Sequence, residues 1–172
     1  LTGLVSRGVG VLPIGLASIG AVLLENGYLV EALDLFNQRT DATSFQRLIE
    51  STRPRIVALS AATETYSNAL RLARICKALD PDVKVVVGGP HVTFMAQETL
   101  REPAVDVVVR GEGEYSMLEL AGYFLRQFGS IDRISGISYR QDGRIQNNQP
   151  RQFVQQLDDL PFLARDLFGG SY

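Results

Sequence analysis

Hydrophobic and polar positions alternate in blocks along the chain, and these blocks predict alternating strands and helices. Three apolar, β-branched runs begin at a proline and end in small residues: PRIVALSAAT (54–63), PDVKVVVGGP (81–90) and PAVDVVVRGE (103–112). Continuous apolar runs are typical of parallel strands that helices bury on both faces. A fourth run, YLVEALDL (28–35), also predicts a strand.

The segments between these runs have the period of amphipathic helices. Helices are predicted over residues 67–80, 92–102 and 114–128. In the first of them, five apolar or small residues fall on one face: Ala69, Leu72, Ala73, Cys76 and Leu79. This alternation predicts a flavodoxin- or Rossmann-like α/β fold, in which a doubly wound parallel sheet carries helices on both faces.

Two further helices are predicted, one before the strand at residues 28–35 and one before the strand at residues 54–63. Pro13 suits the first position of a helix over residues 13–26. Thr43 and Gln46 have the spacing of a capping box and predict a helix that runs through about Ser51.

The strand that should precede the helix at residues 13–26 is predicted to be missing. Residues 1–8 (LTGLVSRG) make a poor strand pattern. In a flavodoxin-like sheet this strand lies inside the sheet, so its loss would leave a gap that another segment or chain must fill. A complete parallel core of five strands, starting at the amino end of the chain, would refute this hypothesis.

The pattern changes after residue 130. Two short strand patterns flank Asp142-Gly143 within residues 136–148 and predict a β-hairpin. Residues 150–172 are polar with isolated apolar positions and are interpreted as a linker or docking tail. The predicted organisation is an α/β domain, a hairpin extension and a linker, at residues 1–130, 131–149 and 150–172.

Composition narrows the function classes. The 172 residues carry a net charge of −2, which does not favour nucleic-acid binding. A single cysteine, Cys76, forms no internal disulfide and no cysteine-rich metal site, and a reducing cytoplasm is expected. The apolar stretch 9–24 is short for a membrane span and contains a proline, so it is interpreted as a buried helix.

Four loops at the carboxyl ends of the predicted strands are rich in small residues. They cover residues 8–15, 60–66, 88–94 and 110–116. Open α/β sheets bind ligands at this edge, and small residues let a ligand approach the backbone. Each loop alone is better explained as a tight strand-to-helix turn, but four at one edge favour a binding site.

Other chemistries have weak support. Residues 8–15 lack the G-x-G-x-x-G pattern of a dinucleotide site. Ser60 has no recognisable His and Asp partners for a hydrolase triad. Glu112 and Glu114 can be an acid pair, although such residues more often complement a helix dipole. Cys76 is expected to be a small core residue.

The order of several short segments is similar to that of one family. GVLPIG, ALSAATETY, VGGPHVTF and VVRGEGE occur in turn, followed by GISYR-DGRI and LDDLPF-ARDLF. This order resembles the N-terminal cobalamin (B12)-binding domain of B12-dependent radical S-adenosylmethionine (SAM) enzymes, over nearly the whole chain. The group includes methyltransferases and proteins resembling the anaerobic Mg-protoporphyrin IX monomethyl ester oxidative cyclase.

The resemblance implies a cobalamin without a histidine ligand from the protein. Other B12 domains carry D-x-H-x-x-G before the first helix, and the histidine ligates cobalt. Here Gly10 stands at the Asp position and Leu12 at the His position, and only Gly15 matches. A base-off cobalamin is therefore implied, with its nucleotide tail running down into the sheet.

The resemblance also implies which residues contact the cofactor. Ser60 and Gly88-Gly89 match positions that line the nucleotide tail, and loops 60–66 and 110–116 would frame the corrin. The full set of implied cofactor-binding residues is Leu12, Pro13, Gly15, Ser60, Ala61, Thr63, Tyr66, Gly88, Gly89, Pro90, His91, Gly111, Glu112 and Gly113.

His91 is the only histidine, and it lies in the fourth strand-to-helix loop rather than the first. It is therefore not expected to be the missing axial ligand. A neutral imidazole at this place can hydrogen-bond a corrin amide or a phosphate. The alternative is a solvent-facing loop histidine beside a turn proline.

The expected role is to hold cobalamin for methyl transfer or related radical chemistry. The chain lacks the C-x-x-x-C-x-x-C motif that holds a [4Fe–4S] cluster, so this piece is not expected to cleave SAM. The resemblance assigns the cluster and SAM to a radical SAM barrel after residues 150–172. The alternatives are a cobalamin-free interaction or substrate-capping module, and a flavin- or nucleotide-binding flavodoxin-like protein in which Tyr66 or Phe94 stacks on the flavin.

Overall fold

One sheet of seven strands organises the molecule, in the order β2-β1-β3-β4-β5-β6-β7. The computed structural model describes residues 2–6, 12–35 and 42–169. The first five strands pair in parallel, and β6 and β7 add antiparallel to β5. The parallel order 2-1-3-4-5 is the flavodoxin-like one, which confirms the predicted fold class. The strands are β1 (Thr2–Ser6), β2 (Val30–Asp34), β3 (Ile56–Ser60), β4 (Lys84–Gly88), β5 (Val107–Val109), β6 (Ile137–Gln141) and β7 (Arg144–Asn147).

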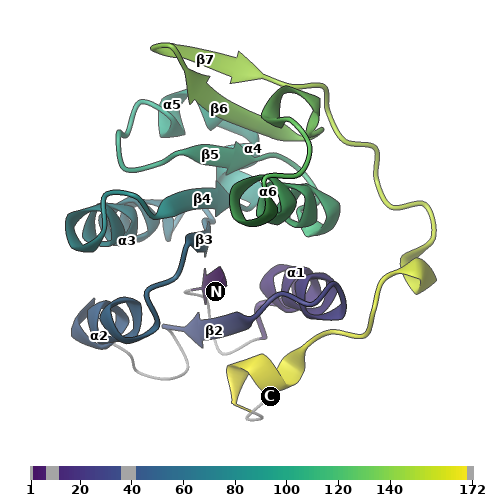
Figure 1. Ribbon diagram of the computed structural model, residues 1–172, viewed down its shortest axis with the longest axis horizontal. Coiled ribbons are helices and arrows are strands. Elements are labelled where there is room, and N and C mark those ends of the chain that lie inside the picture. Colours follow the sequence, from purple (N-terminus) through teal and green to yellow (C-terminus); the bar gives the residue numbers. More distant parts are fainter. Residues whose placement is uncertain (1, 7–11, 36–41, 170–172) are drawn as a thin grey trace.

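Helices cover both faces of this sheet (Figure 1). Helices α1 and α6 pack together over one face, and α2 and α3 pack together over the other. The helices are α1 (Ile14–Glu25), α2 (Ala42–Thr52), α3 (Tyr66–Leu79), α4 (Pro90–Phe94), α5 (Ala96–Thr99) and α6 (Glu114–Arg126), with short 3-10 turns at η1 (Ile131–Arg133), η2 (Leu157–Asp159) and η3 (Arg165–Phe168).

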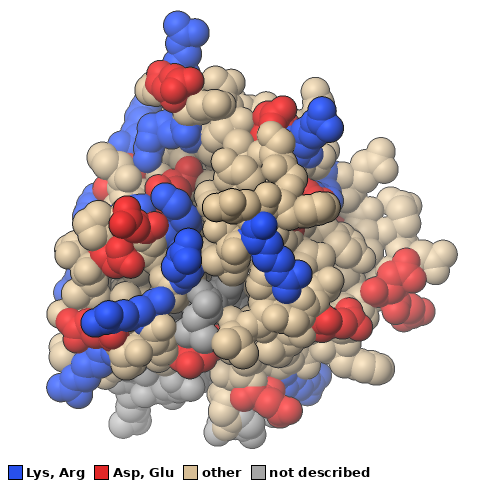
Figure 2. Space-filling view, viewed as in Figure 1, with Lys and Arg blue, Asp and Glu red and all other residues tan. Residues whose placement is uncertain are grey.

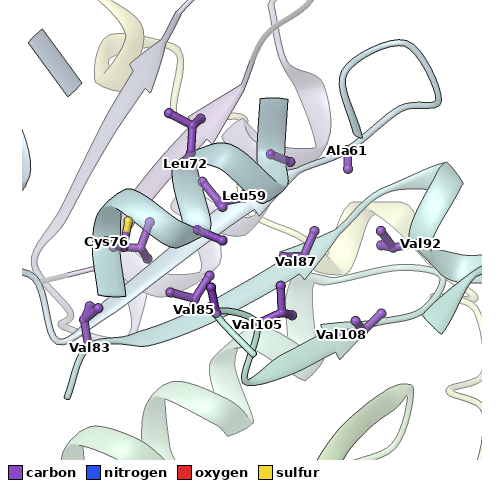
Figure 3. Close-up of a cluster of buried hydrophobic side chains, with 14 of the residues drawn as sticks. Leu59, Ala61, Leu72, Cys76, Val83, Val85, Val87, Val92, Val105 and Val108 are labelled. Atoms are coloured by element: carbon purple, nitrogen blue, oxygen red, sulfur yellow. The ribbon is translucent and has the colours of Figure 1, made fainter. Parts of the chain in front are cut away.

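The predicted apolar runs form the core between the sheet and α3. Figure 3 shows the valines of β4 and β5 meeting Leu72 and Cys76 of α3. Cys76 is fully buried, as the helical pattern predicted. Its burial raises the pKa of the thiol to about 12, so the thiol stays protonated at neutral pH.

The prediction that the first strand is missing is wrong. Strand β1 lies inside the sheet and pairs in parallel with both β2 and β3. Leu4, for example, stands opposite Ala32 on one side and Ala58 on the other. An interior strand of five residues is held by backbone hydrogen bonds from two neighbours, which do not require the long apolar run that the sequence argument sought.

Two helix predictions also differ from the structure. The helix expected over residues 92–102 is two short helices, α4 and α5, separated at Met95. The capping box is absent, because Thr43 lies inside α2 and the Gln46 side chain donates to Glu50 Oε1 instead. The spacing of Thr43 and Gln46 therefore predicted helix α2 correctly but misplaced its start.

The hairpin predicted within residues 136–148 is confirmed as β6 and β7. Asp142 and Gly143 form its turn with positive φ values of 50° and 73°, as a tight two-residue turn requires. The segment that follows runs along the side of the molecule and returns to β2 (Figure 1). Near its end, the Ala164 N–H donates to Ala17 O at 3.2 Å.

Basic and acidic side chains are interspersed on the face shown in Figure 2, with no single-sign patch over the described residues there. Within the described ranges, no helix combines the length and the apolar character that a membrane crossing needs.

Candidate functional site

A pocket of about 330 Å³ lies at the carboxyl edge of the sheet, between β3, β4 and β5 and the helices α1 and α6. Its wall is mostly apolar, and the few polar groups include Ser60, Glu112 and Glu114. The volume is at the lower end of the range for small-molecule sites, about 300–1,000 Å³. The site thus lies where open α/β sheets bind ligands.

The pocket brings together residues from four loops that the sequence placed at one edge. The predicted residues in its wall are Gly15, Ser60, Gly88, Gly89, Gly111, Glu112 and Gly113. The other predicted residues are outside the wall: Leu12, Pro13, Ala61, Thr63, Tyr66, Pro90 and His91. Residues 8–11 of the first loop are outside the described part of the chain.

Sequence reasoning missed much of the apolar wall. The missed apolar residues are Leu16, Ile19, Ala58, Leu59, Val86, Val109, Met117 and Phe153. Glu114, which the sequence suggested only as one of an acid pair or as a helix-dipole partner, also lies in the wall. Strand residues alternate between the two faces of a sheet, but a continuous apolar run does not reveal which face lines a pocket. A helical period does place Met117 one turn after Glu114, so that pair had a usable signal.

Two glycines let the backbone segments of the site approach closely. Gly89 has a φ of 107°, and a Cβ there would lie 2.7 Å from Ala61 O. Backbone hydrogen bonds fix this approach, from Ala61 N to Gly88 O at 2.8 Å and from His91 N to Ala61 O at 3.2 Å. At Gly113, a Cβ would lie 2.8 Å from Ile19 Cδ1, so this glycine permits the close packing of α1 and α6.

The loop between β5 and α6 is held by the hairpin and by α4. Arg110 donates to Ile137 O at 3.0 Å and to Asn148 O at 2.5 Å. The Gly111 N–H donates to Thr93 Oγ1 at 3.0 Å. Desolvation lowers the pKa of Arg110. The loop is therefore fixed by neighbours from both sides of the sheet edge.

Residues 150–154, which we call the strap, lie beside the pocket and are tied to α6 and to the loop before it. Glu112 Oε2 accepts a hydrogen bond from the Val154 N–H at 2.7 Å. Arg151 donates to Ser116 Oγ at 2.9 Å and pairs with Glu119 at 2.6 Å. Phe153 lines the pocket although the residue is 70% exposed. The strap thus brings a large aromatic side chain to the mouth.

Glu114 differs from Glu112. Its Oε2 is buried and has no hydrogen-bond partner among the described residues. A buried polar atom without a partner is costly and calls for an explanation. The amino end of α6, where Glu114 begins the helix, favours a negative charge there.

His91 is fixed beside the pocket rather than in its wall. Its Nδ1 lies 3.2 Å from Thr63 Oγ1, and its ring centroid lies 4.2 Å from that of Tyr66. Leu12 is half-buried and packs against the core cluster of α1 and α6.

The fold and the site define the class of protein. It is a doubly wound α/β domain with an apolar ligand pocket between its parallel strands and two helices. The sequence model of the B12 binding domain matches residues 2–121, and the chain belongs to this family.

Relatives and solved structures agree with this assignment. The chain is 35% identical to an uncharacterized methyltransferase of Pyrococcus horikoshii, over 90% of the chain and 34% of the relative. It is 31% identical to the anaerobic magnesium-protoporphyrin IX monomethyl ester cyclase of Synechocystis, over 85% of the chain and 30% of the relative. The chain therefore spans about a third of these relatives.

A solved structure shares the fold over nearly the whole chain. The cobalamin-dependent SAM radical enzyme OxsB, with aqua-cobalamin and SAM bound, superimposes with a TM-score of 0.83 at 19% identity, over 96% of this chain and 24% of that one. The radical SAM methyltransferase TsrM from Kitasatospora setae, with cobalamin and a [4Fe–4S] cluster bound, gives 0.74 at 19% identity, over 93% of this chain and 30% of that one.

Proposed function

We propose that this domain binds cobalamin in a base-off form, with no protein histidine on the cobalt and with the nucleotide tail in the pocket at the carboxyl edge. The observation that carries the proposal is the pocket itself, which opens between α1, α6 and the sheet. Leu12 stands at the position where the resemblance to B12 domains implies a ligating histidine. A leucine side chain has no atom that can ligate cobalt.

The residues present fit such a tail. Gly15 and Gly111 leave open space where a Cβ would stand, because no described atom lies within 4 Å of that position. The apolar wall suits a flat aromatic base.

The residues of this chain would bind and orient the cofactor. The sheet edge and α1 would hold the tail, the strap would exclude water from the pocket mouth, and His91 would stand at the rim for a corrin amide or a phosphate. When bound, cobalamin supplies a carrier for a methyl group or for related radical chemistry.

We further propose that the domain serves a B12-dependent radical SAM methyltransferase or an oxidative cyclase-like enzyme. Support comes from relatives of both kinds, which are about three times as long as this chain. The single cysteine leaves the [4Fe–4S] cluster and SAM to a barrel in the same polypeptide, with residues 150–172 as the lead-in.

The test is to mix hydroxocobalamin with the purified chain, desalt it and record the visible spectrum. We expect a retained corrin spectrum of base-off type, unchanged in His91→Ala. Gly15→Phe should abolish retention, because its side chain would occupy the pocket without a clash at Cβ.

Three results would contradict the proposal. A histidine-ligated spectrum that disappears in His91→Ala would make His91 the axial ligand. A folded chain that retains no corrinoid would favour the cobalamin-free module, and one that retains flavin mononucleotide instead would favour the flavodoxin-like alternative.

A further inference from the structure

Much of the pocket wall is also part of the hydrophobic core. The lining residues that the pocket shares with the core cluster of α1 and α6 are Leu16, Ala58, Val86, Val109 and Met117. Ile19 of α1 adds a half-buried side chain to the same wall. A ligand group that enters the pocket therefore meets mainly apolar side chains.

The acidic side chains of the wall add little that a ligand can use inside the pocket. Glu112 Oε2 already accepts the Val154 N–H at 2.7 Å. Glu114 Oε2 is buried, so a ligand in the pocket cannot reach it. Ser60 is half-buried at the carboxyl end of β3 and therefore offers its hydroxyl at the edge of the sheet.

Backbone donors beside the pocket are engaged as well. The Ala61 N–H donates to Gly88 O at 2.8 Å, and the His91 N–H donates to Ala61 O at 3.2 Å. The Gly111 N–H donates to Thr93 Oγ1 at 3.0 Å. A ligand group with several polar atoms would lose their hydration in this pocket without gaining matching hydrogen bonds.

The lower bases of corrinoids differ in the number of such polar atoms. Dimethylbenzimidazole, the base of cobalamin, has two ring nitrogens, one of them bonded to the ribose, and two methyl groups. Adenine, the base of a purine cobamide, has more ring nitrogens and an exocyclic amine. An apolar wall favours the burial of methyl groups and penalises donors and acceptors that find no partner.

We propose that the pocket selects corrinoids by their lower base and favours dimethylbenzimidazole over adenine. This inference rests on the proposed function, because it requires the nucleotide tail to lie in the pocket. Ile19 is then a specificity-determining residue. Its side chain packs closely against Gly113 of the same wall, where a Cβ would lie 2.8 Å from Ile19 Cδ1.

The experiment compares methylcobalamin with the methyl form of the adenine cobamide on the whole 172-residue chain. Equilibrium dialysis gives the dissociation constants for the wild type, Ile19→Gln and Ile75→Gln. Ile75→Gln is the matched control, because Ile75 is also a half-buried helical isoleucine but packs in the cluster of α3. Acid titration of each free corrinoid gives the fraction whose base is detached from cobalt, and each dissociation constant is corrected by this fraction.

In the wild type, the corrected dissociation constant should be about tenfold or more higher for the adenine cobamide than for methylcobalamin. Ile19→Gln should narrow this difference about threefold or more, because its amide offers hydrogen bonds to adenine and none to the methyl groups. Ile75→Gln should keep the wild-type difference. Circular dichroism checks that both variants fold, and the wild-type comparison tests base selection independently of them.

The outcomes separate this inference from the proposed function. Equal corrected affinities in the wild type, or tighter binding of the adenine cobamide, overturn base selection and leave the cobalamin site standing. A folded Ile19→Gln variant that keeps the wild-type difference overturns the role of Ile19. Failure of the wild type to bind either corrinoid overturns both proposals.

Discussion

At the scale of single residues, two glycines of the site meet different demands. Gly89 and Gly111 both have positive φ, at 107° and 77°. A Cβ at Gly89 would lie 2.7 Å from Ala61 O, whereas no described atom lies within 4 Å of the same position at Gly111. Gly111 is thus required by its backbone angle alone, and Gly89 by its angle and by packing.

We expect Gly89→Ala to destabilise the domain more than Gly111→Ala does. The positive φ costs an alanine about 1–2 kcal/mol at Gly111. At Gly89 it costs about 1–3 kcal/mol, because the ψ of 174° places this residue in a region almost restricted to glycine. At Gly89 the overlap with the Ala61 backbone adds about 1–3 kcal/mol. Urea denaturation with a common slope measures both differences. Equal losses would show that the loops around Ala61 can move apart.

At the scale of elements, the strap links the pocket to the segment that follows the hairpin. Its anchors come from α6 and from the loop before it, through Glu112, Ser116 and Glu119. Phe153 is held at the mouth by the anchors of its neighbours, the Arg151 side chain and the Val154 N–H, rather than by burial of its own ring, since the residue is 70% exposed. A bound ligand would cover it.

Phe153→Ala should therefore speed the release of bound hydroxocobalamin without changing the stability of the free protein. Burying a phenylalanine contributes about 1.5–3 kcal/mol, so release should be about tenfold faster or more. Competition with excess corrinoid after rapid dilution measures the rate. The matched control is Phe162→Ala, because Phe162 is fully exposed on the same tail. The strap has no role in retention if both variants release the ligand at the wild-type rate.

The sequence predicted elements with long patterns and missed those that depend on distant contacts. The valines of β4 and the periodic face of α3 were strong signals, and both lie in the predicted places. Met95 interrupts the helix expected over residues 92–102, although no glycine or proline lies between Val92 and Leu100. At the site, the glycine loops were found because turns demand small residues, while Phe153 was missed because no local pattern connects it to the pocket.

At the scale of the whole molecule, β1 is the strand that connects β2 to the rest of the sheet. It stands between β2 on one side and β3 to β7 on the other. The far end of the chain also returns to β2, through η3. The pocket depends on this contact between η3 and β2, because one core cluster contains Leu16 of α1, Val30 of β2 and Phe168 of η3.

Leu4→Pro should therefore disrupt the whole domain, although it changes one residue of a short strand. Leu4 stands opposite a residue of β2 and a residue of β3, so a proline removes an interior donor and leaves a carbonyl unpaired. We expect a loss of about 2–4 kcal/mol, a large part of the stability of a typical domain. Gln152→Pro is the control, because its N–H makes no hydrogen bond within the described structure and the residue lies outside the helices and strands. Urea unfolding followed by circular dichroism compares the two, and a Leu4→Pro variant as stable as this control would mean that β1 is dispensable to the sheet.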